Sequence, residues 1–272
     1  MTVVPVLLYH SVSADPPAWI APYTVAPSVF AEQLDRLADA GRTVVPLRRL
    51  VAAQRGGPQL PERSAVLTFD DGFEDFYWTV APILTERGLP ATLYLTTGAV
   101  HPPGEEGSGS LLPPAPMLNW RQVATLDAYG FDIGGHSLTH PQLDTLGRAR
   151  LCAEVADCKR ILEDALGHPV TNYAYPHGYN SAAVRRKVHQ AGWTSATAVA
   201  NRFSSQADDP LRIARLMVRA DTAPDLFQQW VTGHGAPIAP RPERLRTKGW
   251  RVYRRLRAAV GRPAGGPPPV ED

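Results

Sequence analysis

Two adjacent carboxylates follow a short hydrophobic run in the first third of the chain. Residues 65–69 read as a buried strand, and Asp70-Asp71-Gly72 comes directly after it. Neighbouring side chains of a strand point to opposite faces, so both carboxylates can serve one site only if the chain bends, and Gly72 permits that bend. One carboxylate could then bind a metal ion while the other acts as a base. A surface turn that caps the next helix would use the same residues.

A pair of histidines four residues apart is the second candidate. His136 and His140 would share one side of a helical turn, close enough to bind one ion, and Gly134-Gly135 before them lets the backbone approach closely. Two unrelated surface histidines are the alternative when the pair is considered alone. With a carboxylate from another strand end, the pair would form a two-histidine, one-aspartate set that leaves coordination positions open for water and substrate.

Two more clusters lie at expected strand ends. Tyr175-Pro176-His177-Gly178 could present a backbone N–H group to an oxyanion, although a plain strand-to-helix connection would also use such residues. His10 follows the first apolar run, and its place at the carboxyl end of a strand makes it a candidate acid. Residues 135–139 are close to the nucleophile elbow of a serine hydrolase, but Thr139 stands where the last glycine should be.

The elements that must position these residues alternate between strand and helix. We expect strands at 3–9, 43–45, 65–69, 91–96, 131–133, 173–175, 194–199 and 213–218, and helices at 28–41, 75–87, 119–129, 146–166, 181–191 and 224–231. Such alternation indicates parallel strands with crossover helices, in an α/β sheet or barrel. In these folds the chemistry gathers where strands end and loops begin.

The composition is that of an ordinary globular protein. The chain has 272 residues, of which 44% are hydrophobic and 20% charged, so a disordered, collagenous or coiled-coil protein is excluded. No apolar run approaches the roughly 18 residues of a membrane span. Pro5 interrupts the first apolar stretch, which lacks the flanks of a secretory signal. Cys152 and Cys158 lie too far apart in one expected helix for a disulfide bond. We therefore expect a cytoplasmic protein.

The charge is distributed unevenly along the chain. The net charge is +2, but residues 241–262 hold nine Lys or Arg and one Glu, so the rest is acidic. Nucleic-acid binding is not expected, whereas a local anionic partner is. Trp250, Tyr253, Leu256 and Val260 recur at helical spacing between arginines. This basic amphipathic helix could contact an anionic membrane, pack back on the body with its arginines solvated, or be disordered. We divide the chain into a catalytic domain, 1–235, and a Pro/Arg-rich tail, 236–272.

The motifs together resemble the polysaccharide deacetylase family, also called carbohydrate esterase family 4 or the NodB homology domain. Residues 68–72, Thr-Phe-Asp-Asp-Gly, match its first motif, and residues 136–140, His-Ser-Leu-Thr-His, match its second. The resemblance covers roughly residues 3–232 and implies a distorted (β/α) barrel of about seven strands. It implies that Asp71, His136 and His140 hold one divalent metal and that Asp70 is the catalytic base. Zinc is our first choice, and nickel, cobalt or iron also suit this ligand set.

The third motif departs from the family pattern, which is usually Arg-x-Pro-Tyr-Gly. Ala174 stands where the arginine would be and His177 replaces the tyrosine, so Arg215 could stand in as the residue that orients the base. Tyr175, Pro176 and His177 would then line the substrate or oxyanion site.

The late Leu-x-His motif that supplies the acid is also missing, and His234 is poorly placed for it. Residues 8–12, Leu-Tyr-His-Ser-Val, look like the early acid motif of a permuted subgroup similar to the poly-β-1,6-N-acetylglucosamine deacetylases. His10 would be the acid by that resemblance.

The resemblance implies metal-assisted hydrolysis of an N-acetyl group on an amino sugar in a poly- or oligosaccharide. Two alternatives stay open at this point. One is a deacylase of a small or lipid-linked acetylated sugar, or of another amide or ester. The other is a non-catalytic carbohydrate-binding relic of the fold, against which the complete set of Asp70, Asp71, His136 and His140 argues.

Overall fold

The computed structural model describes residues 3–102, 104, 110–241 and 245–260. Its centre is a closed barrel of parallel strands, with the order β1-β10-β9-β8-β7-β6-β5 and a β1–β5 pairing that completes the ring. The strands are β1 (Val6–Tyr9), β5 (Ser64–Phe69), β6 (Thr92–Leu95), β7 (Asp132–Gly135), β8 (Asn172–Ala174), β9 (Ser195–Val199) and β10 (Ile213–Met217). The expected seven-stranded (β/α) barrel is confirmed.

Three short strands lie outside the ring. β4 (Thr43–Val44) adds to the edge of β5. β2 (Ser11–Val12) and β3 (Thr24–Val25) form a separate two-stranded sheet that the sequence did not indicate, since each has only two residues.

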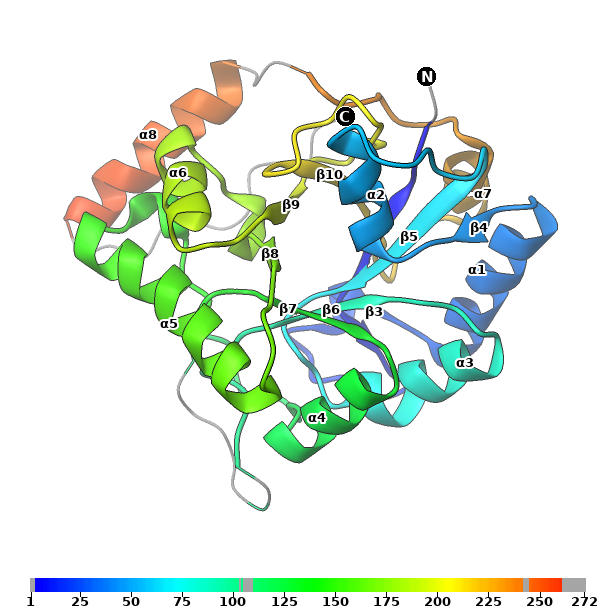
Figure 1. The fold of residues 1–272 in the computed structure, drawn as a ribbon, viewed down its shortest axis with the longest axis horizontal. Helices are drawn as coiled ribbons and strands as arrows, with labels where there is room; N and C mark the ends of the chain where they lie inside the picture. Colours follow the sequence, from blue (N-terminus) through cyan, green and yellow to red (C-terminus); the bar gives the residue numbers. More distant parts are fainter. Residues whose placement is uncertain (1–2, 103, 105–109, 242–244, 261–272) are drawn as a thin grey trace.

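Helices surround the barrel (Figure 1). They are α1 (Pro27–Asp39), α2 (Leu47–Gln54), α3 (Ala81–Glu86), α4 (Trp120–Ala128), α5 (Arg148–Leu166), α6 (Ala182–Gln190), α7 (Pro224–Thr232) and α8 (Leu245–Ala259), with the short turns η1 (Ala21–Tyr23), η2 (Phe76–Val80), η3 (Leu143–Thr145) and η4 (Pro176–Gly178). The helix expected at 75–87 is present as the π-helical turn η2 continued by α3. None of the described helices combines the length and the hydrophobicity that a bilayer crossing requires.

Helix α2, which the sequence analysis did not predict, packs against the side chains that fill the interior of the barrel. Its buried Leu47, Leu50 and Val51 belong to one cluster with Val6 and Val66, which lie on β1 and β5. Adjacent residues of these strands, such as Leu67, belong to the larger core between strands and helices, as the alternation of side chains along a strand requires. The positions 47, 50 and 51 have helical spacing, but a segment of eight residues gives a weak periodic signal.

The tail forms a helix in its described part. α8 packs against η3, and its Arg254 is only 2% exposed, so the expectation that its arginines would be solvated is wrong for this side chain. Before α8, the Phe203 amide donates to Pro237 O, which ties the start of the tail to the barrel. Residues 242–244 and 261–272 of the predicted tail lie outside the described residues.

Candidate active site

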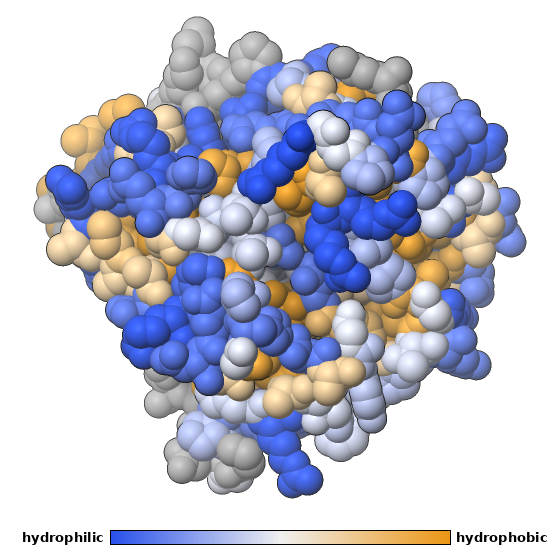
Figure 2. Space-filling view, in the orientation of Figure 1, coloured by the Kyte–Doolittle hydropathy of each residue, from blue (hydrophilic) through white to orange (hydrophobic). Residues whose placement is uncertain are grey.

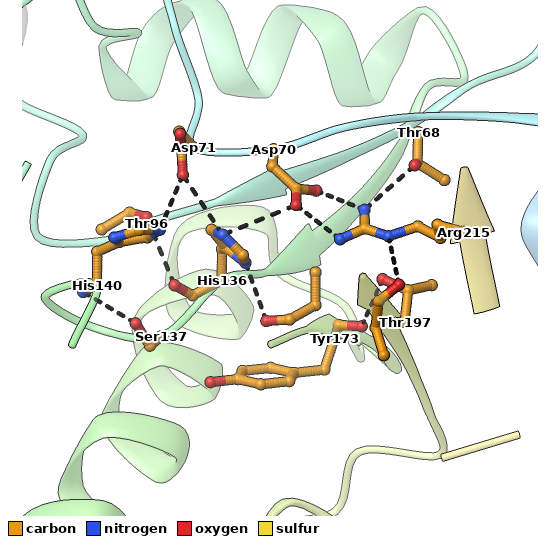
Figure 3. Close-up of polar contacts among 12 residues, drawn as sticks. Thr68, Asp70, Asp71, Thr96, His136, Ser137, His140, Tyr173, Thr197 and Arg215 are labelled. Carbon is orange, nitrogen blue, oxygen red and sulfur yellow. Dashed lines mark hydrogen bonds and ion pairs between the residues drawn. The ribbon is translucent and has the colours of Figure 1, made fainter. Parts of the chain in front are cut away.

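Asp71, His136 and His140 converge at the carboxyl ends of β5 and β7. Asp71 Oδ1 lies 3.4 Å from His136 Nε2 and 3.2 Å from His140 Nε2, and one ligand atom from each residue falls within 4.8 Å of the others. Figure 3 shows Asp71 pointing toward both imidazoles, whereas Asp70 points toward Arg215 and has one oxygen 3.8 Å from His136 Nε2. The three residues expected to hold a metal are therefore together.

The backbone at this site bends through left-handed residues. Asp71 itself has φ 75°, and Gly72 after it has φ 92°, so the turn that we assigned to the glycine starts one residue earlier. Aspartate tolerates this conformation better than most residues. The expected helical turn at 136–140 is wrong, because Ser137 (φ 68°) and His140 (φ 64°) form an irregular loop. Such strain persists where the surrounding structure holds it, often at functional sites.

Hydrogen bonds orient the two histidines. His136 Nδ1 donates to Ala174 O at 2.9 Å, which leaves Nε2 to face Asp71. The amide of His140 donates to Ser137 Oγ at 2.9 Å. Ala174 thus serves the site through its backbone, at the position where the family pattern has an arginine.

The Asp71 carboxylate fits a bound cation. Its Oδ1 is buried and accepts no hydrogen bond from the described residues. Burial alone would raise the pKa of Asp71, but the His140 and His136 imidazoles outweigh it and hold that pKa well below its usual range. An ionised, buried carboxylate oxygen together with two imidazole nitrogens is a donor set that a divalent metal takes.

Gly134 and Gly135 let the backbone before His136 pack closely against neighbouring residues. A Cβ atom on Gly135 would lie 2.5 Å from the Trp193 ring, and one on Gly134 would lie 2.7 Å from Asn172 O. Only glycine fits such close approaches, so the expected role of this pair is confirmed.

Arg215 on β10 clamps Asp70 from the opposite side. Its Nη1 and Nη2 donate to the two carboxylate oxygens of Asp70, both at 2.7 Å, and its side chain is fully buried. Nη1 also donates to Thr68 Oγ1 at 3.2 Å. Burial would raise the pKa of Asp70, but Arg215 reverses that shift and lowers it. Arg215 therefore has the geometry of the stand-in that we expected.

His10 lies beside the paired carboxylates. β1 and β5 pair in register with Tyr9 opposite Phe69, and the Asp70 amide donates to Tyr9 O at 3.0 Å. His10 and Asp70 are therefore the next residues after two neighbouring strands. His10 Nδ1 is buried and has no hydrogen-bond partner among the described residues.

The third motif contributes one side chain to the site rather than three. His177, at the left-handed φ of 57°, places its ring 4.6 Å from that of His140. Burial and the His140 imidazole lower the pKa of His177. Tyr175 and Pro176 are buried, and the Tyr175 hydroxyl donates to Leu211 O at 2.9 Å. Their buried side chains therefore stabilise the turn rather than face the site.

A large cleft opens over these residues. Its volume is about 1990 Å³, and its lining includes His10, Asp70, Asp71, His136, His140 and His177. Among the described residues, Arg215, Tyr175 and Pro176 do not line it. His234, the other candidate acid, is exposed and does not line it either.

Two acids that sequence reasoning missed, the buried Glu154 and the half-buried Asp75, hold the loops of the site. Glu154 on α5 accepts hydrogen bonds from the Thr139 amide at 2.9 Å and the Thr139 hydroxyl at 2.6 Å. Asp75 accepts from the Ser11 hydroxyl at 2.5 Å and the Val12 amide at 3.2 Å, which ties the His10 loop to the Asp70–Asp71 turn. Glu154 could have been found from the sequence, because it is a glutamate on the buried face of an amphipathic helix. No sequence signal pointed to Asp75.

We expect substitutions of Asp70 and Arg215 to have coupled effects on the free energy of unfolding. Arg215→Met would leave a buried carboxylate unpaired and lower the free energy of unfolding by about 3–5 kcal/mol. The double variant Arg215→Met/Asp70→Asn should lose less, because it leaves no stranded charge. Denaturant unfolding of the wild type, both single variants and the double variant measures this. Equal losses in Arg215→Met and the double variant would mean that Asp70 does not depend on Arg215.

Asp75 should make stability depend on pH. Burial raises the pKa of Asp75 to about 6, against the opposing hydrogen bonds from Ser11 and Val12. A raised carboxyl pKa contributes stability that is complete below the unfolded value, near 4, and lost as the pH rises through the folded value. Wild type should therefore lose stability relative to Asp75→Asn between about pH 4 and pH 6. Asp39→Asn, at an exposed position, is the control, and parallel pH curves for wild type and Asp75→Asn would contradict the assignment.

Comparison with known proteins agrees with this geometry. The family model described as polysaccharide deacetylase matches residues 57–196. Protein YxkH of Bacillus subtilis is 26% identical over 204 residues, or 73% of this chain. The poly-beta-1,6-N-acetyl-D-glucosamine N-deacetylase of Escherichia coli K12 is 43% identical over 68 residues, or 25% of this chain. The matches span 66% and 10% of the two relatives' own lengths.

A solved structure shares the fold. IcaB from Ammonifex degensii superposes with a TM-score of 0.69 at 24% identity, over 87% of this chain and 98% of that one. At this identity the likeness concerns the fold, and the barrel described above is the same. The family match covers about half of the chain and both of its sequence motifs. The chain belongs to the polysaccharide deacetylase family.

Proposed function

We propose that the protein is a metal-dependent hydrolase that removes N-acetyl groups from amino sugars in a poly- or oligosaccharide. The observation that carries the proposal is the separation of two adjacent carboxylates. Asp71 lies between His136 and His140, whereas Asp70 is held on both oxygens by a buried arginine and lies farther from His136, at 3.8 Å. Neighbouring residues with such different partners can act as metal ligand and as base.

Asp71, His136 and His140 would hold the divalent ion. Three protein ligands are the usual number at a catalytic zinc site, where positions stay open for water and substrate. The ion, when bound, supplies positive charge that acidifies water and polarises a carbonyl group. The His136–Ala174 hydrogen bond would keep the ligand nitrogen correctly oriented.

Asp70 would accept the proton from the attacking water. Arg215 holds both of its oxygens and keeps its pKa below the usual value, so the carboxylate is ionised and ready at neutral pH. Arg215 lies outside the cleft lining and would act as a positioning residue.

His10 would protonate the departing amine. Burial lowers the pKa of His10, with Asp71 and Asp70 opposing that shift. A general acid must hold its proton before it donates it, so the two carboxylates, which favour protonated His10, support this role against the effect of burial. The backbone N–H of His177 would donate to the oxyanion that develops on the acetyl group. The products are acetate and a free amino sugar, so a carbon–nitrogen bond is hydrolysed.

An extended glycan is the substrate that the cleft favours. Its volume of about 1990 Å³ exceeds the roughly 300–1,000 Å³ of a typical small-molecule pocket. The E. coli relative is named for poly-beta-1,6-N-acetyl-D-glucosamine, which makes a β-1,6-linked polymer our first choice. A small or lipid-linked acetylated sugar would occupy only part of the cleft.

We expect ligand and base variants to separate metal binding from turnover. Asp71→Ala, His136→Ala and His140→Ala should each lose bound metal, because each removes one of three ligands. Asp70→Asn should keep the metal and lose turnover by about 100-fold or more, since the general base is gone. Metal content by mass spectrometry and acetate release from β-1,6- and β-1,4-linked N-acetylglucosamine oligomers and the monosaccharide measure both effects.

The same experiment tests the alternatives. Full activity of Asp70→Asn would remove Asp70 from the base role. Stoichiometric metal in the wild type without acetate release from any of these sugars would favour the non-catalytic carbohydrate-binding relic. Release from the monosaccharide alone would favour a small substrate.

The acid role of His10 predicts a matched pair of variants. His10→Gln should lower kcat by about 100-fold or more, because it removes the proton donor. His234→Gln, the exposed alternative, should leave kcat unchanged. Steady-state kinetics on the best oligomer measures both, and bound metal should stay at the wild-type level in each. A larger loss in His234→Gln than in His10→Gln would contradict the assignment.

A further inference from the structure

α8 binds the body of the protein through its arginines. Nη1 and Nη2 of Arg254 donate to the two carboxylate oxygens of Asp144, both at 2.7 Å, and Arg255 Nε donates to Asp144 O at 2.8 Å. The Arg254 guanidinium also lies over the Tyr179 ring, 3.4 Å from its centroid. This buried ion pair directs the basic side of the helix inward.

The apolar side of the same helix faces outward. Three large hydrophobic side chains are exposed along it and a fourth directly after its end: Val252 (56%), Tyr253 (43%), Leu256 (64%) and Val260 (68%). Figure 2 shows hydrophobic side chains at the upper left edge of the molecule, where Figure 1 places α8. An amphipathic helix on a globular protein normally turns its apolar stripe to the core. Here the apolar side chains remain exposed, because the ion pair with Asp144 binds the basic side of the helix to the body.

Basic residues flank this exposed stripe. On a helical wheel of 100° per residue, Arg255 and Arg257 fall on either side of the four apolar positions. The helix from 245 to 259 contains no acidic residue. Tyr253, whose hydroxyl accepts a hydrogen bond from Arg257 at 2.9 Å, lies where the apolar stripe meets the basic edge.

We propose that the outward face of α8 is a docking surface for an anionic lipid bilayer. Exposed apolar side chains bordered by arginines fit the boundary between acyl chains and anionic headgroups. A second copy of the chain fits less well, because pairing of two such faces would bring two basic helices together. The helix can bind in this orientation without leaving the barrel, since the ion pair with Asp144 lies on its other side.

Docking would place the catalytic cleft beside the lipid surface. Trp250, Tyr253 and Arg254 of α8 line that cleft together with His140 and His177. The helix would lie in the plane of the headgroups rather than cross the bilayer, since its inward side is basic. The surface itself does not depend on the proposed deacetylase activity.

Vesicle binding of the full chain tests the proposal. The probes are phosphatidylcholine vesicles with about 30% phosphatidylglycerol and vesicles of phosphatidylcholine alone. Val252→Asp/Leu256→Asp alters the exposed stripe. Trp78→Asp/Tyr129→Asp is the matched control, because these side chains are 67% and 71% exposed on other elements. Thermal unfolding of each variant checks that it is folded.

We expect the wild type and the control to bind the anionic vesicles, with affinity that falls as salt rises. Val252→Asp/Leu256→Asp should bind about tenfold or more weakly. Val252→Ser/Leu256→Ser, which adds no charge, should also bind more weakly, and it provides the test if the aspartate variant does not fold. Absent wild-type binding, or equal binding by the serine variant, would overturn the proposal. A dimer that these substitutions dissociate, without vesicle binding, would assign the face to a second copy instead.

Discussion

The pairing of β1 with β5 closes the sheet into a barrel, and the site depends on this closure. In register, Leu8 lies opposite Thr68 and Tyr9 opposite Phe69, so the chain's first strand ends where the first motif begins. Because β10 pairs with β1, closure also brings β10 near β5 and lets Arg215 reach Asp70. An open sheet with the same strands would leave the His10 and Arg215 strands far from the carboxylates. The fold thus assembles groups that are widely separated in sequence.

Different surroundings give two neighbouring aspartates different chemistry. The left-handed turn at Asp71 lets successive side chains reach the same cleft, which a straight strand forbids. Arg215 then compensates the charge of Asp70, while Asp71 has only imidazoles beside it. The buried Asp71 Oδ1 accepts no hydrogen bond from the described residues, which is costly, and a bound cation would remove that cost. The geometry therefore supports a metal on one aspartate and a free base on the other.

Strand and helix periodicity, which is a local signal, predicted an α/β sheet or barrel with its chemistry at the strand ends. The resemblance to the deacetylase family implied the barrel and the roles of the motif residues. It anticipated Arg215 only through the missing arginine at Ala174. It did not predict the left-handed loop of His140 or the inward role of Tyr175, since both depend on what packs around them. The sequence also did not predict which face of α8 packs on the body. A helical wheel defines an apolar and a basic face, and the ion pair of Arg254 with buried Asp144 shows that the basic face points inward.

Anomalous diffraction from crystals grown with zinc is the most direct test of the different roles of Asp70 and Asp71. We expect one strong anomalous peak about 2.0–2.2 Å from Asp71 Oδ1, His136 Nε2 and His140 Nε2. In the same crystal, Asp70 should remain paired with Arg215 and should not touch the ion. A peak coordinated by Asp70, or no peak among these three residues, would contradict the division of roles between the two aspartates.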